Sequence, residues 1–298
     1  MLQNSKAIYE TNFKDLKLLK RGKVRDIYDL GKYLLLISTD RLSAFDVVFR
    51  EPIPNKGIVL NKLSEFWFNK TSELVRNHFI STLVSNHYPE LMKYEEELKN
   101  RSMIVEKTKV IPFEFIVRGH LMGSAYEEYK NDCKVGSYML EKGLKYGDKL
   151  PKPLFTPSTK EEGKHDRNIT YEELKDLIGE AKAEKISKIS LNLYEFAYNY
   201  ALNRGIIIAD TKFEFGEIEN EIILIDEIFT PDSSRFILKD DFDKGRVDKS
   251  LDKQFVRDYL TSIGWNKEPP PPSLPKDVIE ETSQRYLKIY ELLTGNNL

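Results

Sequence analysis

Charged residues interrupt two apolar segments that otherwise have the composition of buried β-strands. The segments are residues 205–216, GIIIADTKFEFG, and residues 221–227, EIILIDE. Side chains alternate between the two faces of a strand, so Asp210, Lys212 and Glu214 share one face while Phe213 and Phe215 point the other way. We therefore expect one face of this strand to pack in a core and the other to carry chemistry.

If the two segments pair as a hairpin, the length of the turn decides which residues face each other. A two-residue turn at Glu219-Asn220 would place Asp226 opposite Phe213, on the wrong face for Glu214. A loop one residue longer, or a bulge, would place Asp226 opposite Glu214. Directly opposed residues have Cβ atoms about 5 Å apart, a separation from which two carboxylates can reach one divalent cation.

The carboxylate pair suggests a metal–nucleotide site. Mg²⁺ requires oxygen ligands and is commonly held by one or two carboxylates together with substrate phosphates, which makes Glu214 and Asp226 candidate ligands. A ladder of Lys/Glu ion pairs on a solvated sheet face would produce the same pattern, so the hairpin alone leaves both interpretations open.

The overall charge argues against a large polyanion as the partner. The 298 residues contain 46 Lys and Arg against 48 Asp and Glu, a net charge of −2, so neither nucleic acid nor an anionic membrane is expected to bind. Cys133 is the only cysteine, which excludes an intrachain disulfide. The first residues have no apolar stretch typical of a signal peptide, and no membrane-spanning run is present, so we expect a cytoplasmic protein.

The expected elements change character along the chain, from β-rich to mixed to helical. This order favours an α+β fold over a regular βαβ alternation, with a β-rich lobe over residues 1–110 and a mixed α/β lobe over residues 111–298. We expect strands at 16–19, 24–30, 33–38, 102–105 and 113–117, and helices at about 59–75, after the capping box that starts at Thr170, at 186–203, 253–263 and 278–293.

Two short segments in the first lobe are candidates for binding a polyphosphate. Gly22, Lys23, Val24 and Arg25 lie between two expected strands, where glycine permits close backbone approach and the two cations are two residues apart. Residues 38–46 combine hydroxyls, carboxylates and an arginine after an apolar strand. An exposed basic hairpin and a hydrogen-bonded turn, respectively, would account for the same residues.

Two arginines and a serine form a candidate clamp for a phosphate monoester. Arg118 and Ser124 follow one expected strand, and Asp232 and Arg235 follow the charged hairpin. Guanidinium groups bind phosphate through two parallel hydrogen bonds. Residues 155–160, which end at Lys160, together with His165 and Asp166, are expected on a loop between elements.

Taken together, these segments resemble the phosphoribosylaminoimidazole-succinocarboxamide synthase (SAICAR synthase) family. The resemblance covers nearly the whole chain, with two small departures at Met122 and Arg167. The motifs that carry it are Gly22-Lys-Val-Arg-Asp26, Ser43-Ala-Phe-Asp46, Val117-Arg-Gly119 with Gly123-Ser124, Phe155-Thr-Pro-Ser-Thr-Lys160, residues 210–216, residues 230–235 and residues 252–257.

The resemblance implies an ATP-dependent ligase that joins L-aspartate to the carboxylate of carboxyaminoimidazole ribonucleotide. It also implies an ATP-grasp or kinase-like nucleotide cleft, with ATP between the β-rich lobe and the rest. The implied route is an acyl phosphate that the aspartate amine attacks. By this resemblance, the residues with expected roles are Glu214 and Asp226 for Mg²⁺, Gly22, Lys23, Val24 and Arg25 for ATP, Lys212 for the transferred group, Arg118, Ser124, Asp232 and Arg235 for the ribonucleotide, and Lys160, His165 and Asp166 in the cleft.

Two competing interpretations are kept. One is another ATP-dependent carboxylate–amine ligase with a different acceptor, and the other is a non-catalytic nucleotide-binding module. Paired buried carboxylates have no evident use in a module without catalysis, which argues against the second. The oligomeric state and the general base for the aspartate amine do not follow from the sequence, although His165 is a candidate for that base.

Overall fold

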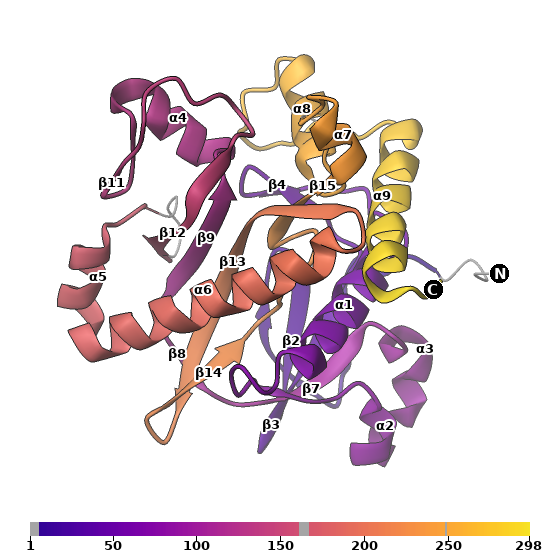
Figure 1. Cartoon of the computed structure of the whole chain (residues 1–298). Coiled ribbons are helices and arrows are strands. Elements are labelled where there is room, and N and C mark those ends of the chain that lie inside the picture. The colour runs from indigo at the N-terminus through magenta and orange to yellow at the C-terminus, as the bar shows by residue number, and fades with distance from the viewer. Residues whose placement is uncertain (1–5, 161–166, 248) are drawn as a thin grey trace.

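Two antiparallel sheets organise the chain (Figure 1). The computed structural model describes residues 6–160, 167–247 and 249–298. The first sheet has five strands in the order β1-β2-β3-β7-β6. Its strands are β1 (Lys17–Arg21), β2 (Arg25–Leu30), β3 (Tyr33–Ser38), β6 (Phe79–Ser81) and β7 (Ser102–Glu106).

The second sheet has six strands and carries the residues of the charged hairpin. Its order is β12-β9-β13-β14, and β13 also pairs with β15 and β8 along other parts of its length. The strands are β8 (Lys109–Val110), β9 (Phe113–His120), β12 (Lys149–Thr159), β13 (Ile206–Ile218), β14 (Glu221–Ile225) and β15 (Ser234–Leu238). Two small ribbons pair β4 (Ser43–Ala44) with β5 (Val47–Val48) and β10 (Lys134–Val135) with β11 (Tyr138–Met139).

Helices cover the sheets and close the chain. The helices are α1 (Lys56–Lys70), α2 (Val84–His87), the 3₁₀ helix η1 (Pro89–Tyr94), α3 (Glu95–Leu98), α4 (Gly123–Asp132), α5 (Tyr171–Ile178), α6 (Glu180–Leu202), α7 (Lys239–Asp243), α8 (Gln254–Ser262) and α9 (Lys276–Thr294). The long helix α6 crosses one face of the second sheet, and α9 lies beside α1 (Figure 1). The predicted capping box begins α5, where Thr170 accepts a hydrogen bond from the Glu173 amide.

One apolar core joins the two sheets. Trp67 of α1 is fully buried, and its ring centroid lies 5.3 Å from that of Tyr200 on α6 and 5.0 Å from that of Phe229 after β14. Phe213 and Phe215, on the apolar face of β13, belong to the same cluster. Replacing a core aromatic of this size by alanine costs about 3–5 kcal/mol. The N-terminal part of the chain is therefore packed against the C-terminal part through a shared core.

The predicted helices and strands are found, with corrections to some bounds and with further elements that were not predicted. Residues 155–160 were expected as a loop, but residues 155–159 form the end of strand β12, in which Thr156, Pro157 and Ser158 pair with β9, and Lys160 follows the strand. Three prolines concealed this strand; β12 lies at the edge of its sheet, where a residue without an N–H is tolerated. The helix expected over 59–75 ends at Lys70. The elements that were not predicted are α4, the short helices α2, η1, α3 and α7, and the strands β4, β5, β6, β8, β10, β11 and β15. The boundary near residue 110 stays a prediction, although the first sheet ends at Glu106.

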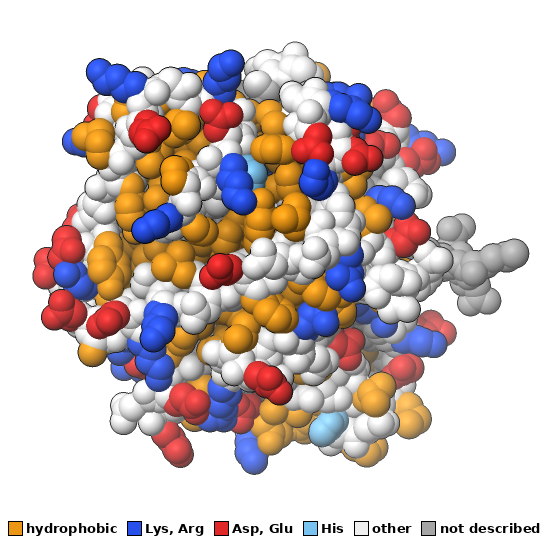
Figure 2. All heavy atoms as spheres, viewed as in Figure 1, with side chains coloured by type: hydrophobic (Ala, Val, Ile, Leu, Met, Phe, Trp, Pro, Cys, Tyr) orange, Lys and Arg blue, Asp and Glu red, His pale blue; other side chains and the backbone are white. Residues whose placement is uncertain are grey.

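The surface seen in Figure 2 is charged around its edge, and apolar side chains gather in the hollow between α4 and α6. Tyr126 of α4 and Tyr198 of α6 are only partly buried. None of the helices in the described part of the chain has the length and apolar character needed to span a membrane.

Candidate active site

The charged hairpin closes with a two-residue turn. Glu219 and Asn220 both have left-handed backbone conformations, with φ of 49° and 67°, as a type I′ turn requires. The register pairs Glu214 with Ile225, so the longer loop or bulge considered as the alternative is wrong. Asp226 is the first residue beyond the end of β14.

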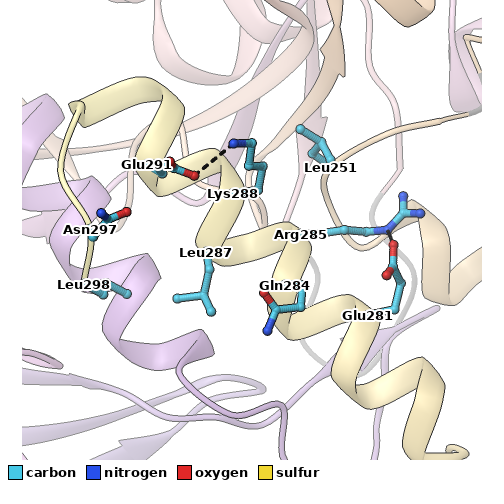
Figure 3. A pocket seen from close by; sticks show the side chains of 9 residues that line it. All are labelled: Leu251, Glu281, Gln284, Arg285, Leu287, Lys288, Glu291, Asn297 and Leu298. Carbon is cyan, nitrogen blue, oxygen red and sulfur yellow. Dashed lines mark hydrogen bonds and ion pairs between the residues drawn. The ribbon is translucent and has the colours of Figure 1, made fainter. Parts of the chain in front are cut away.

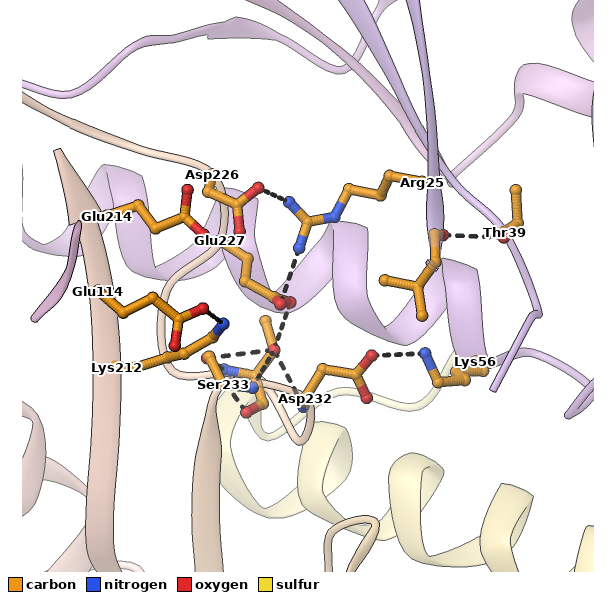
Figure 4. Close-up of polar contacts among 12 residues, drawn as sticks. Arg25, Thr39, Lys56, Glu114, Lys212, Glu214, Asp226, Glu227, Asp232 and Ser233 are labelled. Carbon is orange, nitrogen blue, oxygen red and sulfur yellow. Dashed lines mark hydrogen bonds and ion pairs between the residues drawn. The ribbon is translucent and has the colours of Figure 1, made fainter. Parts of the chain in front are cut away.

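The two carboxylates nevertheless meet. The backbone of Asp226 has a φ of 70°, which turns the chain out of the strand, and its side chain lies beside that of Glu214 (Figure 4). Burial, followed by the negative charge of Asp226, raises the pKa of Glu214 above its usual value. Residues beyond the end of a strand do not follow its alternation, which is why the two-residue turn does not separate the pair.

Basic side chains from three parts of the chain lie around these carboxylates. Arg25 of β2 bonds to Asp226 and, at 2.7 Å, to Glu227. Lys160, at the end of β12, bonds to Glu214 at 2.6 Å, and Lys212 bonds to Glu114 of β9. These residues, which the sequence places up to 201 positions apart, surround one charged centre. Figure 4 shows Arg25 and Lys212 there beside the carboxylates. We call the centre around Glu214 and Asp226 the carboxylate end.

The charges at the carboxylate end stabilise one another. Burial opposes ionisation of Asp226, but Arg25 and the lysines more than offset it, so the pKa of Asp226 is lowered. The pKa of Lys212 is raised despite burial because Glu114 and Glu214 lie close. Arg25 is likewise held charged by Asp226 and Glu227. All three groups are therefore ionised at neutral pH.

The residues predicted to clamp a phosphate lie together at the other end of the same face of β13. Asp210 is the registered partner of Arg118 on β9 and of Arg235 on β15. Its carboxylate lies 3.6 Å from an Arg118 nitrogen and 3.4 Å from an Arg235 nitrogen. Arg118 also donates to Thr156 at 2.9 Å and to Ser124 at 3.2 Å. We call this group the arginine end.

The arginine end has unused hydrogen-bonding capacity. Nη1 of Arg235 is buried and has no partner among the described residues. Gly123, with φ of 54°, lets the guanidinium approach, because a Cβ atom at this position would lie 2.0 Å from Nη2 of Arg235. Gly123 also begins α4, so Ser124 lies in the first turn of a ten-residue helix. The first turn of a helix has backbone N–H groups without intrahelical partners. Together with two arginines, these groups favour the binding of a phosphate.

Asp232 lies between the two ends and is held by two elements. Its carboxylate accepts hydrogen bonds from Lys56 of α1 at 2.7 Å and from the Tyr286 hydroxyl of α9 at 2.6 Å. The Lys56 ammonium keeps the pKa of Asp232 well below its usual range, although burial alone would raise it. A buried, fully bonded carboxylate of this kind has a fixed position.

The structure thus brings most of the predicted site residues to one face, with two exceptions. Lys23 bonds to Asp46 at the surface and does not converge with Arg25 on one group. His165 and Asp166 lie outside the described residues. The residues that sequence reasoning missed are Lys56, Glu114, Glu227 and Tyr286. Alternation along 113–117 places Glu114 on the face of Arg118 and was the available signal for it.

The chemistry of the carboxylate end fits Mg²⁺ only if a substrate completes the coordination. In the part of the chain that the structure describes, no three His, Cys, Asp or Glu side chains are grouped closely enough to hold a metal ion. Glu214 and Asp226 face each other with like charges, and that repulsion is one cause of the raised pKa of Glu214. Two such carboxylates with phosphate oxygens are a common Mg²⁺ site.

Fold and site define an α+β enzyme with a charged centre between two antiparallel sheets. Solved structures share this fold. The chain is similar to a SAICAR synthase from Saccharomyces cerevisiae complexed with SAICAR, with 41% identity, a TM-score of 0.87, and coverage of 98% of this chain and 99% of that one. It is also similar to a SAICAR synthetase in complex with ADP, at 27% identity and a TM-score of 0.70 over 94% and 98% of the two chains.

Relatives of known sequence agree with the structural comparison. Phosphoribosylaminoimidazole-succinocarboxamide synthase from Geotalea uraniireducens is 49% identical over 98% of this chain and 99% of its own length. The enzyme of that name from Desulfosudis oleivorans is 50% identical over 97% and 99%. The model of the SAICAR synthetase family matches residues 18–272. The chain belongs to the SAICAR synthetase family, and it is a ligase.

Proposed function

We propose that this protein carries out the reaction of its family, the ATP-dependent joining of L-aspartate to carboxyaminoimidazole ribonucleotide, on the charged face of β13. The observation that carries the proposal is the arrangement of Asp210, Lys212 and Glu214 on that face, with the arginine end at Asp210 and the carboxylate end at Glu214. Four residues of strand span roughly 13 Å. This spacing suits a ligand with a phosphate at one end and a reacting carboxylate at the other.

The carboxylate end would bind the nucleotide and the metal. Glu214 and Asp226 would hold Mg²⁺, which when bound neutralises phosphate charge. Gly22 to Arg25 and the rest of residues 1–110 would cover ATP, with residues 111–298 supplying the acceptor site. Arg25 and Lys160 neutralise the two carboxylates, and both would be available to a phosphate that binds there. Lys212, whose pKa is raised, stays charged beside the transferred group.

The arginine end would bind the ribonucleotide phosphate. Arg118, Ser124 and Arg235 supply donors, and the unpartnered Arg235 nitrogen gains a hydrogen bond when a phosphate is present. Asp232 is fixed between this end and the metal carboxylates, and it would accept from a hydroxyl of the same ligand. Both contacts orient the acceptor before reaction, which is the main requirement for phosphoryl transfer.

Two steps complete the proposed reaction. An oxygen of the imidazole carboxylate attacks the γ-phosphorus of ATP, the bond to the β–γ bridging oxygen breaks, and ADP leaves. The aspartate amine then attacks the acyl carbon, the carbon–oxygen bond to phosphate breaks, and the amine loses its proton. His165 stays a candidate acceptor of that proton, as do water and the departing phosphate. This reaction is consistent with a cytoplasmic protein.

The direct test is ADP release from the purified protein with Mg·ATP, carboxyaminoimidazole ribonucleotide and L-aspartate, omitting one component at a time. The proposal expects ADP release to require all three substrates and the divalent cation. ATP turnover that is indifferent to the imidazole nucleotide would refute the assigned acceptor. Replacing L-aspartate by L-asparagine or L-glutamate separates this ligase from one with another amine substrate.

A further inference from the structure

Helix α8 brings two cations toward the site that the proposed roles leave unused. Lys253, at the N-cap of α8, and Arg257 form no ion pair in the described part of the chain. By contrast, a cavity of about 610 Å³ along α9 is lined by charges that are already paired (Figure 3). There Arg285 bonds to Glu281 at 2.7 Å and Lys288 to Glu291 at 2.9 Å. The charges that line this cavity are therefore already paired with one another.

The start of α8 is tied to the arginine end. Asp252 accepts hydrogen bonds from the amide of Gln254 at 2.6 Å and from the amide of Phe236 at 3.2 Å. Phe236 follows Arg235 on β15, so the first turn of α8 is fixed against that strand. Residues four apart lie on one face of a helix, which places Lys253 and Arg257 together on the side facing the site.

Lys253 lies between the two ends of the site. The charged groups that act on its ammonium are Asp232 with an attractive effect, and Arg257, Lys212 and Lys56 with a repulsive one. Asp232 attracts Lys253, but its hydrogen bonds go to Lys56 and Tyr286, and it forms no ion pair with Lys253 in the described part of the chain. Burial together with these cations lowers the pKa of Lys253 to about 8. An anionic ligand beside Lys253 would therefore stabilise the charged form of its side chain.

Arg257 has a free donor beside the same region. Its Nε is buried and lacks a hydrogen-bond partner among the described residues. Its guanidinium lies 5.7 Å from the ring of Phe45, in the Ser43–Asp46 motif. Arg235 repels its charge, and Asp252 and Asp210 attract it. The Phe45 ring covers one side of the guanidinium, which leaves its planar edge for a ligand. A carboxylate fits that edge through two parallel hydrogen bonds.

We propose that Lys253 and Arg257 bind the two carboxylates of the amino-acid substrate, L-aspartate. The inference rests on the proposed function, because the other anions of that reaction have their own partners at the two ends of β13. A dicarboxylic amino acid needs two cations near the reacting carboxylate, and Lys253 is close enough to Lys212 for the two charges to repel each other. These residues would therefore make the enzyme specific for a dicarboxylic amino acid over a neutral one.

The test is the steady-state kinetics of Lys253→Met with aspartate varied at saturating Mg·ATP and ribonucleotide. Loss of one charge-assisted hydrogen bond predicts a rise in the apparent KM for aspartate of roughly 10- to 100-fold. The KM values for ATP and for the ribonucleotide should not change. Lys253→Arg should recover part of the aspartate affinity, and Arg257→Leu should act in the same direction as Lys253→Met.

Lys267→Met is the matched control, because Lys267 is exposed and contacts the outer side of the Phe45 ring at 4.7 Å. It should leave all three KM values unchanged. A rise in the ribonucleotide KM in place of the aspartate KM, or no kinetic change, would overturn the inference. If Lys253→Met does not fold, Arg257→Lys tests the same inference. Its preference for aspartate over alanine, measured as the ratio of the two rates, should fall, and an unchanged ratio would overturn the inference. Wild-type ADP release that ignores aspartate would refute the proposed function itself, before any variant is compared.

Discussion

The two ends of the β13 face are built in different ways. At the arginine end, Asp210 lies directly between Arg118 and Arg235 on adjacent strands, and these side chains are at most 15% exposed. At the carboxylate end, Lys160 and Lys212 are 39% and 32% exposed and reach the site on flexible side chains. Backbone register positions the charges at the arginine end, and long, partly exposed lysine side chains supply charge at the carboxylate end. The first arrangement suits a phosphate that is only bound, and the second suits one that is transferred.

Removing a carboxylate should produce the largest effect. We expect Glu214→Gln to lower kcat by roughly a thousandfold or more, because one of two metal ligands is lost where transition-state charge develops. Its thermal stability should change little, since the change also removes the repulsion from Asp226. Turnover and Tm are the measurements.

The matched control for that change is Glu217→Gln. Glu217 lies three residues further along β13 and pairs with Lys182 at 2.7 Å, away from Asp226. It should retain wild-type turnover. Normal activity in Glu214→Gln would contradict the metal assignment and remove the distinction between the two ends.

Removing an arginine should produce a smaller and more selective effect. Arg118→Ala is expected to raise the apparent KM for the ribonucleotide by roughly a hundredfold and to leave the KM for ATP unchanged. Arg118→Lys keeps the charge but loses the planar pair of donors, so it should recover only part of the affinity. An equal loss of ATP affinity would show that the two ends do not bind separate ligands.

The arginine end should also affect stability in a pH-dependent way. Burial raises the pKa of Asp252 from 3.8 to about 6, despite its two amide hydrogen bonds and the nearby Arg235 and Arg257. A carboxyl group whose pKa is higher in the folded state stabilises the fold below about 4, and this contribution is lost as pH rises through about 6. The shift corresponds to about 3 kcal/mol.

Asp252→Asn removes that titration. Denaturant unfolding between pH 4 and pH 8 should show the unfolding free energy of the wild type falling with pH more steeply than that of the variant. Parallel curves would mean that Asp252 has the same pKa in both states. The comparison uses the difference between the curves, because other groups titrate in both proteins.

The smallest effect is expected at the hairpin turn. Glu219 and Asn220 both have positive φ, and Asn-Gly is the preferred pair for a type I′ turn. The double change Glu219→Asn with Asn220→Gly should raise the unfolding free energy by less than about 1 kcal/mol and leave turnover unchanged. Lower turnover would indicate that the turn affects the position of Asp226.

Much of the fold followed from local pattern. The alternation in residues 205–216 correctly placed Phe213 and Phe215 in the core and the three charged residues on the other face, because a strand has a fixed period of two. The capping box at Thr170 correctly marked the start of α5. Strand β12 was missed because its prolines are typical of loops, and only its edge position makes them compatible with a sheet.

The sequence by itself determined the family, the charged face of β13 and the identity of the carboxylates, because ordered motifs and strand alternation are local properties of the chain. Tertiary structure decided their partners. The approach of Asp226 to Glu214 depends on a left-handed residue beyond a strand end, and the pairing of Arg25 with Asp226 joins residues 201 positions apart. Such contacts depend on how two sheets pack on one core, which no local pattern encodes.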